Sequence, residues 1–202
     1  MSRASEPVFY GMVIAGGASK RMGRDKALTE YHGRPQWEYC AGLLKEFCAT
    51  VYISKNTGQR WEPSANFETL TDKQADQGPF HPWSHLYTLQ TEAYWILMTC
   101  DLPFANRDCI QFLVGKFQTE PESTDALCLR AEDQDFPDPQ IALLSPSGTL
   151  AAQAAYNAGE RSPRRFLKSI NTQAYAPKDP AWLYSANTPE AVKSAQAILS
   201  EL

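Results

Sequence analysis

The sequence has no excess of positive charge. It carries 19 lysines and arginines against 23 aspartates and glutamates, which gives a formal net charge of −4. This balance argues against a broad basic surface for nucleic acid, although a small cluster of cations can still hold a phosphate. No apolar stretch approaches the roughly 20 residues that span a bilayer, and residues 1–7 lack the apolar run of a signal peptide. We therefore expect no nucleic-acid or membrane partner and a cytoplasmic location.

The sequence also lacks a framework of disulfides or zinc ligands. It contains neither a Cys-x-x-Cys pair nor a cysteine spacing typical of zinc sites. The five cysteines are Cys40, Cys48, Cys100, Cys109 and Cys128. They are scattered through apolar segments, so we expect buried, reduced thiols. The 202 residues suffice for one substantial core and are too few for two comfortable domains, so we expect a single domain over residues 1–202.

Apolar strands alternate with amphipathic helices along the chain. The pattern predicts strands at 8–15, 51–54, 67–71, 94–100, 125–129 and 140–144. It predicts helices at 35–48, 84–93, 107–117, 148–157, 162–170 and 188–199, with Asn106 as the N-cap of the third. The strand at 94–100 is apolar throughout, as is typical of burial on both faces. We expect an α/β fold with three α/β/α layers around a Rossmann-like, mostly parallel sheet, in which one or two late strands are antiparallel.

Sheets of this kind bind ligands beyond the carboxyl ends of their strands. Gly16 follows the first strand at such an end, Asp72 follows the third, and Asp101 follows the buried strand. Gly16 belongs to a glycine-rich loop from Ala15 to Lys26. Glycines let a backbone approach a ligand and turn its N–H groups towards an anion. The loop also contains four cations within seven residues: Lys20, Arg21, Arg24 and Lys26. A polyphosphate is the ligand that requires both features.

Two better-known phosphate loops do not match this segment. It lacks the Gly-Lys-Ser/Thr ending of a Walker A loop and the Gly-x-Gly-x-x-Gly spacing of dinucleotide-binding loops. Its own pattern, Ala-Gly-Gly-x-Ser-x-Arg-Met-Gly-x-Asp-Lys, resembles the signature of the MobA-like nucleotidyltransferases, best known as molybdenum cofactor guanylyltransferases. Further landmarks follow in the family's order: Gly33-Arg-Pro35, Asp72 before Gly78-Pro79, Asp101-Leu-Pro103, Gly159-Glu-Arg-Ser162 and Asn187-Thr-Pro-Glu190. The resemblance implies a fold of the nucleotide-diphospho-sugar transferase type.

The resemblance also implies a chemistry, the transfer of a nucleotidyl group to a phosphorylated acceptor with release of pyrophosphate. Both reactants are anionic, so the reaction needs cations, a metal ion and a metal-binding carboxylate rather than a protein nucleophile. The family pattern assigns catalysis to Arg21, Lys26 and Asp101. It assigns nucleotide binding to Ile14, Ala15, Gly16, Gly17, Lys26, Asp72, Gly78 and Asp101. Mg²⁺ is the expected cofactor, with Asp101 as its ligand and Asn187 as a second candidate.

The family pattern also bears on the two substrates. Guanylyl-transferring members carry Ala-Gly-Gly where cytidylyl-transferring relatives carry Ala-Ala-Gly, so Ala15-Gly16-Gly17 favours GTP. A basic cluster follows residue 160: Arg161, Arg164, Arg165 and Lys168. The resemblance places part of it, Arg161 and Arg164, near the phosphate of a molybdopterin-type acceptor. A solvated helix face explains the same cluster equally well.

Three positions depart from the family pattern. Gly78-Pro-Phe-His-Pro82-Trp83 replaces Gly-Pro-Leu-x-Gly, a change that can reshape the edge of the pocket. Ser54 replaces an asparagine at the end of the second strand, with Asn56 two residues on, and Ser185 replaces the first asparagine of Asn-x-Asn-Thr-Pro.

Other side chains favour structural interpretations. His81 and His85 lack a third zinc ligand, and the acidic stretch with Glu132, Asp133, Asp135 and Asp138 lacks the pattern of a calcium loop, so we expect a solvated loop. The tryptophans at 61, 83, 95 and 182 are most simply core or pocket-wall residues.

Three interpretations of function stay open. The first is a Mg²⁺-dependent guanylyltransferase acting on molybdopterin. The second keeps the enzyme class with another base, such as that of CTP, or another phosphorylated acceptor. The third is a nucleotide-binding module without turnover.

Overall fold

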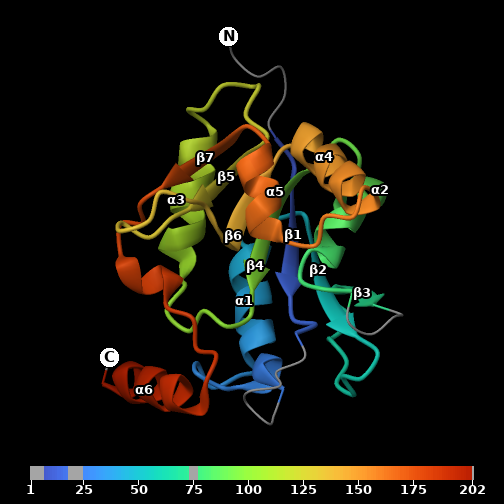
Figure 1. Cartoon of the computed structure of the whole chain (residues 1–202). Helices are drawn as coiled ribbons and strands as arrows, with labels where there is room; N and C mark the ends of the chain where they lie inside the picture. The colour runs from blue at the N-terminus through green and yellow to red at the C-terminus, as the bar shows by residue number, and fades with distance from the viewer. Residues whose placement is uncertain (1–6, 18–24, 73–76, 202) are drawn as a thin grey trace.

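The computed structural model describes residues 7–17, 25–72 and 77–201. Its strands are β1 (Phe9–Ile14), β2 (Thr50–Asn56), β3 (Glu68–Asp72), β4 (Tyr94–Thr99), β5 (Ala126–Leu129), β6 (Asp138–Leu144) and β7 (Thr172–Tyr175). Within these residues they form a seven-stranded sheet in the order β3-β2-β1-β4-β6-β5-β7. β6 runs antiparallel to β4 and β5, whereas the other strand pairs are parallel. The predicted mostly parallel sheet with a late antiparallel strand is confirmed (Figure 1).

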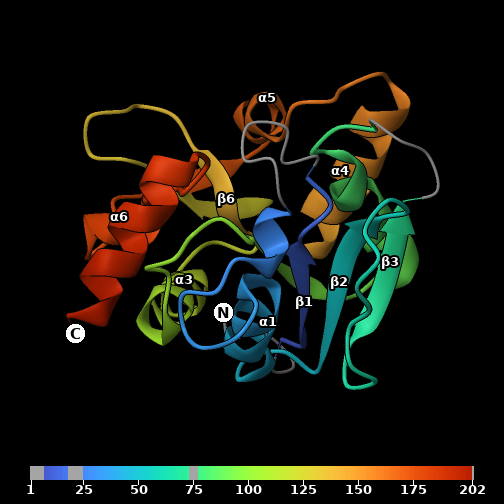
Figure 2. The ribbon, with the colours of Figure 1, turned by 90° about the horizontal axis from the view of Figure 1, so that it is seen from below.

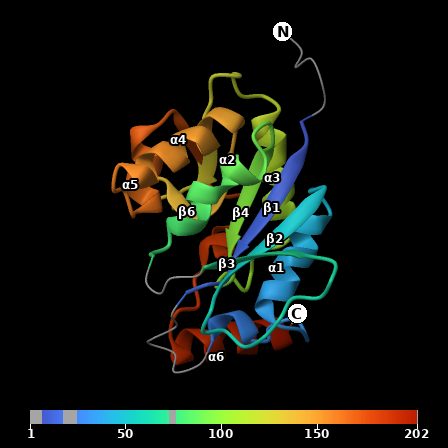
Figure 3. The same cartoon turned by 90° about the vertical axis from the view of Figure 1, so that its right-hand side faces the viewer.

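Helices cover both faces of the sheet. They are α1 (Gln36–Lys45), α2 (Leu86–Leu89), α3 (Arg107–Phe117), α4 (Pro146–Asn157), α5 (Pro163–Ser169) and α6 (Pro189–Ser200). Short 3-10 helices are η1 (Lys26–Leu28), η2 (His81–His85) and η3 (Pro180–Leu183). Figure 3 shows α1 and α3 on one side of the strands and α2, α4 and α5 on the other, so the three-layer prediction is confirmed. None of the helices described by the structure combines the length and the apolar character needed to cross a membrane.

Strand β4 lies at the centre of the core. Four successive side chains, from Trp95 to Met98, are completely buried. Ile96 and Met98 pack in the cluster under α1 and α3, whereas Trp95 and Leu97 pack in the cluster under η2, α4 and α5. Alternate residues of a strand point to opposite faces, so an uninterrupted apolar strand is the sequence that two covered faces require. The predicted burial of this strand on both faces is confirmed.

The sequence predictions of secondary structure fail at two places. The helix predicted at 84–93 is wrong in extent, because α2 ends at Leu89 and Gln90 is already extended, with φ −154°. The chain must turn there for Tyr94 to pair with Phe9 at the start of β4. Strand β7 was not predicted, since its four residues are all only partly buried and give no apolar signal. The N-cap prediction is confirmed, because the side chain of Asn106 accepts a hydrogen bond from the backbone of Cys109.

Candidate functional site

The parallel strands β1 to β4 end at one edge of the sheet, which Figure 2 shows from below. Ile14 ends β1 and Ala15 follows it as a buried residue whose N–H donates to the carbonyl of Ser54 over 2.9 Å. Asp72 ends β3, and Asp101 follows β4. The three places selected by the strand-end rule therefore lie along one edge, although Lys20, Arg21 and Arg24 fall outside the described residues.

The side chain of Lys26, the last residue of the glycine-rich loop, lies next to Gly17 near the start of the same loop. It opens η1, which Asp25 caps by accepting a hydrogen bond from the backbone of Ala27 over 3.0 Å. A Cβ atom at Gly17 would stand 3.2 Å from Cε of Lys26, so the missing side chain leaves room for the lysine. Lys26 Nζ lies 3.1 Å from Oδ2 of Asp101. The expected phosphate-binding cation and the expected metal-binding carboxylate are therefore in direct contact.

Asp101 is buried, at 5% exposure, with its two carboxylate oxygens in different surroundings. Oδ2 accepts hydrogen bonds from Lys26 and from the hydroxyl of Ser185, the latter over 2.9 Å. Oδ1 is also buried and has no well-aligned hydrogen-bond partner among the residues that the structure describes, although the nearby Thr99 hydroxyl helps to lower the pKa of the carboxyl group. Burial raises the pKa of Asp101. The positive charge of Lys26 and the hydrogen bonds lower the pKa by more than burial raises it, so the net pKa lies below its usual value. The group is an ionised carboxylate at neutral pH.

The segment before α6 is bound to Asp101. The N–H of Ala186 donates to the backbone carbonyl of Asp101 over 2.9 Å. Asn187 donates from Nδ2 to the hydroxyl of Ser185 over 2.5 Å, and Ser185 donates in turn to Asp101. A hydroxyl can both accept and donate, so serine at this position connects the amide with the carboxylate. Asn187 thus reaches Asp101 through Ser185.

The unpartnered oxygen of Asp101 fits a magnesium ion. Mg²⁺ is usually bound through one or two carboxylates, with substrate phosphates and water completing the shell. Oδ1 of Asp101 offers one such oxygen, with Lys26 next to it as a second positive group for a polyphosphate. No cluster of three or more His, Cys, Asp or Glu side chains suited to a metal occurs within the described ranges.

Asp72 contacts His81 at the other corner of the edge. Nδ1 of His81 lies 2.8 Å from Oδ1 of Asp72, and both side chains are 17% exposed. That oxygen has no well-aligned hydrogen-bond donor in the described part of the chain. Burial lowers the pKa of His81, and the nearby His85 and Arg161 add to this, whereas Asp72 opposes it. The net pKa lies below 6.5, so His81 is largely neutral at pH 7.

Gly78 brings the segment before η2 against Arg161. Its φ of +82° lies in the region that favours glycine, and a Cβ there would stand 3.8 Å from the carbonyl oxygen of Arg161. The guanidinium of Arg161 lies 3.9 Å from the ring centroid of Tyr156 and donates to two backbone carbonyls. The charge of Arg161 also lowers the pKa of His81. This arginine therefore lies near the corner formed by Asp72, His81 and Gly78.

The rest of the basic cluster has separate contacts. Arg165 forms an ion pair with Glu160, 2.7 Å between Nη2 and Oε1. Arg164 and Lys168 each lie 4.7 Å from the ring centroid of Phe136. The four cations therefore do not form one uniform surface, and Arg161 is the member connected with the Asp72 corner.

One expectation about an individual residue needs correction and another is narrowed. Trp83, expected as a core or pocket-wall residue, belongs to the core: it is fully buried with Pro82 and packs against Phe166, ring centroids 6.2 Å apart, because η2 covers the sheet with this side. Asp138 does not lie in a solvated loop: it begins β6 and is partly buried. Burial and the charge of Asp101 raise its pKa, although Arg164 opposes them.

Other expectations are confirmed. Glu132, Asp133 and Asp135 are exposed, and the five cysteines are buried and free of disulfides. Trp95 and Trp182 are core residues, at 0% and 3% exposure.

Sequence reasoning missed the contacts that three side chains make with the glycine-rich loop. Asn56 donates from Nδ2 to the carbonyl of Gly16 over 2.9 Å. Gln59 and Trp61 both donate to the carboxylate of Asp25, each over 2.7 Å. In the sequence, Asn56 stands out only as the asparagine two residues after Ser54. The polar segment with Gln59 and Trp61 has neither apolar periodicity nor a family landmark, so nothing there predicts a contact with Asp25.

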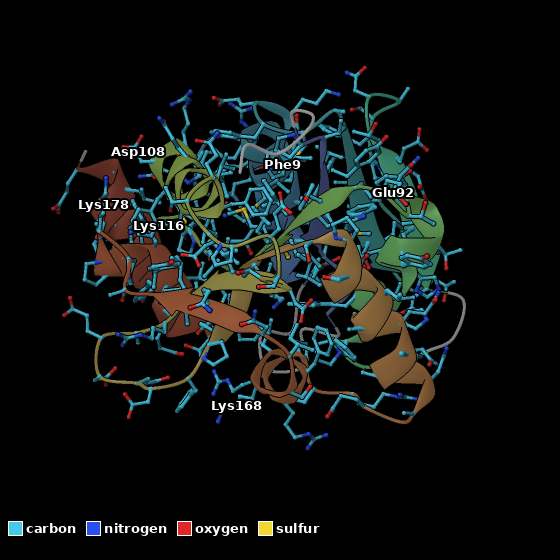
Figure 4. The ribbon with its side chains drawn as sticks, turned by 90° about the horizontal axis from the view of Figure 1, so that it is seen from above. Phe9, Glu92, Asp108, Lys116, Lys168 and Lys178 are labelled. Carbon is cyan, nitrogen blue, oxygen red and sulfur yellow. The ribbon has the colours of Figure 1, made fainter. Side chains whose placement is uncertain are left out.

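A hollow of about 960 Å³ lies elsewhere, on the outer side of α3. Its lining includes Phe112 and Trp182 together with Asp108, Lys116 and Lys178. Figure 4, which looks from the end opposite to Figure 2, shows these last three residues at the margin of the molecule. None of the site residues at the carboxyl edge lines this hollow.

Comparisons with known proteins agree with this geometry. The model of the family described as "MobA-like NTP transferase domain" matches residues 11–175. The probable molybdenum cofactor guanylyltransferase of Synechococcus elongatus is 30% identical over 186 residues, which cover 90% of this chain and 94% of the relative. The molybdenum cofactor biosynthesis bifunctional protein of Synechocystis is 29% identical over 188 residues, 92% of this chain. The match spans only 53% of that relative's length.

Solved structures show the same fold. The molybdopterin-guanine dinucleotide biosynthesis protein A of Archaeoglobus fulgidus superposes with a TM-score of 0.75 at 19% identity and covers 96% of this chain and 100% of its own. A putative glucose-1-phosphate thymidylyltransferase of Bacillus anthracis gives 0.73 at 14% identity, with 96% of each chain covered. The predicted fold of the nucleotide-diphospho-sugar transferase type is confirmed.

Proposed function

Since this chain belongs to the family of MobA-like NTP transferases, we propose that it transfers GMP from GTP to a molybdopterin-type acceptor, with Mg²⁺ as cofactor and release of pyrophosphate. The observation that carries the proposal is the contact of Lys26 with Asp101 directly beside Gly17. We propose that residues 1–202 form a single nucleotidyltransferase domain. A cytoplasmic location is part of the proposal, favoured by five free, buried cysteines.

The reaction joins two anions. An oxygen of the acceptor phosphate attacks the α-phosphorus of GTP, the bond from that phosphorus to the bridging oxygen of the β-phosphate breaks, and pyrophosphate leaves. When bound at Asp101, Mg²⁺ supplies positive charge to the phosphate oxygens. Lys26 is the residue that exchanges its contact with Asp101 for a phosphate, and its charge is already at the site before the nucleotide arrives.

The nucleotide is proposed to lie along the edge from β1 to β3. Backbone groups of Ile14, Ala15, Gly16 and Gly17 face it at the end of β1, where the absence of side chains at the two glycines permits a close approach. Asp72 is proposed to accept hydrogen bonds from the ribose or the guanine, which is supported by its carboxylate oxygen that lacks an aligned donor. Gly78 forms the opposite wall of that corner.

The roles of two further groups rest on the family pattern. Arg21 is proposed to hold the β- and γ-phosphates, and it lies outside the described residues. Asn187 is proposed to support the metal. The structure favours an indirect role for it, because its amide donates to Ser185 and Ser185 donates to Asp101.

The acceptor is proposed to lie beyond Asp101, towards α5. Arg161 and Arg164 are both exposed and carry no carboxylate partner in the described structure, whereas Arg165 is bound to Glu160. The first two are therefore the better candidates for an acceptor phosphate. The pKa of Asp138 is lowered by the charge of Arg164 and raised by the charge of Asp101. Asp138 therefore interacts electrostatically with both Arg164 and the proposed catalytic carboxylate.

A nucleotide panel tests the proposal. Calorimetry with GTP, CTP and ATP in the presence of Mg²⁺ is expected to show GTP binding at least tenfold more tightly than the other two, a difference of about 1.4 kcal/mol. Tighter binding of CTP or ATP would replace the proposal with the transfer of another base. Binding of GTP without any pyrophosphate release on addition of molybdopterin would favour a module without turnover.

A further inference from the structure

Asp25, the last residue but one of the glycine-rich loop, accepts three hydrogen bonds from described residues. Its Oδ1 accepts from the backbone N–H of Ala27 over 3.0 Å. Its Oδ2 accepts from Nε2 of Gln59 and from Nε1 of Trp61, both over 2.7 Å. Hydrogen bonds from neutral donors to a carboxylate are stronger than those between neutral groups. The residue directly before Lys26 is therefore fixed from two sides, by its own helix and by the segment after β2.

Gln59 connects this carboxylate with two strands. Its Nε2 also donates to the carbonyl of Ala15 over 2.9 Å, and its Oε1 accepts from the N–H of Asn56 over 2.9 Å. One side-chain amide thus joins the end of β1, the end of β2 and the start of η1. Removing it would free all three contacts at once.

Trp61 is itself held in place on both sides. Its ring stacks on Trp37 of α1, with centroids 5.2 Å apart and planes 10° from parallel. Lys55, which is only 3% exposed, donates to the carbonyl of Trp61 and pairs with Glu62 over 2.7 Å. The indole N–H therefore points at Asp25 from a rigid support rather than from a free loop side chain.

We propose that Gln59 and Trp61 are positioning residues of the nucleotide site: by holding Asp25, they fix Lys26 across Gly17 and beside Asp101. The side chain of Lys26 passes beside Gly17, where a larger residue would crowd it, and contacts the carboxylate of Asp101, 75 positions further along the chain. A lysine side chain has several rotatable bonds, so its placement depends on the backbone from which it starts. The proposal rests on the proposed function in one respect, that Lys26 binds nucleotide phosphates.

The test uses two variants and one matched control in the full chain. Trp61→Phe keeps a smaller aromatic ring for Trp37 and removes the indole donor, a loss of ring surface that the control shares, and Gln59→Met removes the amide at similar length. Trp182→Phe is the control, because Trp182 is buried and its Nε1 has no hydrogen-bond partner in the described structure. Two quantities are measured for each protein besides its melting temperature. They are the rate of Lys26 acetylation by trace acetic anhydride without nucleotide, followed by peptide mass spectrometry, and the Kd for GTP with Mg²⁺.

We expect Lys26 to be acetylated several-fold faster in both variants, since it leaves Asp101 more often. Each variant should bind GTP about tenfold more weakly, the usual consequence of losing one hydrogen bond to a charged group. Trp182→Phe should change neither quantity. Unchanged labelling and affinity would overturn the proposal, and so would weaker binding without faster labelling. Equal effects in the control would also overturn it. If Lys26 responds as expected but the wild type does not bind GTP, the positioning role stands and the proposed function is wrong.

Discussion

The hydroxyl of Ser185 donates a hydrogen bond to Oδ2 of Asp101 over 2.9 Å, and Asn187 donates to the same hydroxyl. Ser185 stands where the family pattern has an asparagine. The serine preserves a polar connection between the segment before α6 and the carboxylate, so this departure is compatible with an active site.

Removing the Ser185 hydroxyl is expected to weaken catalysis. Ser185→Ala leaves Asp101 with one donor fewer and frees Asn187, so kcat should fall about tenfold, as expected for one hydrogen bond to a charged group. The measurement is pyrophosphate release over a range of Mg²⁺ concentrations. Ser185→Asn, which restores the family residue, should keep most of the activity. Ser200→Ala is the control, because the hydroxyl of Ser200 donates to the carbonyl of Ala197 within its own helix, and an equal loss there would refute the assigned role.

A methyl group at position 17 is expected to displace Lys26. In Gly17→Ala the new Cβ would stand 3.2 Å from Cε of Lys26, closer than ordinary contact, so the end of the flexible lysine side chain must shift by a few tenths of an ångström. A 1 Å misplacement of a catalytic group can cost about a hundredfold in rate, so this smaller shift should lower kcat/KM by about tenfold or less. Steady-state kinetics with GTP measure the loss.

Gly115→Ala provides the control for that experiment. Gly115 lies within α3 and a Cβ there meets nothing within 4 Å. The substitution should leave kcat/KM unchanged and stabilise the helix by about 0.5–1 kcal/mol. A loss of activity in Gly115→Ala, or none in Gly17→Ala, would contradict the placement of Lys26.

His81 is expected to make folding sensitive to acid. Its pKa in the folded chain lies below the ordinary value of 6.5, so the unfolded chain binds the proton more readily. This contribution to stability is present above pH 6.5 and is lost as the pH falls through the lower, folded-state pKa. Burial is the largest cause of the lowered pKa of His81; Asp72 opposes it, and His85 and Arg161 add to it. Urea unfolding at pH 7.5 and pH 5 should show a smaller loss of stability in His81→Gln than in the wild type, and an equal loss in both would contradict this account.

Trp83 is expected to contribute to stability rather than to specificity. Because the ring is fully buried against Phe80 and Phe166, Trp83→Ala should destabilise the fold by about 3–5 kcal/mol. Denaturant unfolding measures this loss. If the folded fraction of the variant preferred a different base from the wild type, Trp83 would belong to the pocket after all.

The sequence was sufficient to predict the features that depend on strong local patterns. The apolar run at 94–100 predicted a strand buried on both faces, and the expected parallel sheet placed the glycine-rich loop and Asp101 at the carboxyl ends of their strands. Both steps follow from periodicity and from the rule that places ligands at the strand ends. The direct contact of Lys26 with Asp101 was not predicted.

The features that could not be predicted depend on contacts between distant segments. Gln59 and Trp61 lie 34 and 36 residues from Asp25, in a polar stretch without periodicity. The sequence left Trp83 as either a core or a pocket-wall residue, and the packing of η2 decides for the core. Strand β7 is held at a sheet edge by pairing with β5, and its four partly buried residues carry no pattern of their own.

The most direct test of guanylyl transfer is the release of pyrophosphate by wild-type protein and by Asp101→Asn, each with GTP, Mg²⁺ and molybdopterin. The asparagine keeps the size of Asp101 and removes the charge that the metal requires. Wild-type protein should release pyrophosphate only when the acceptor is present, and the variant should be slower by about a hundredfold or more. Equal rates in the two proteins, or no pyrophosphate from the wild type with GTP and acceptor, would contradict the account.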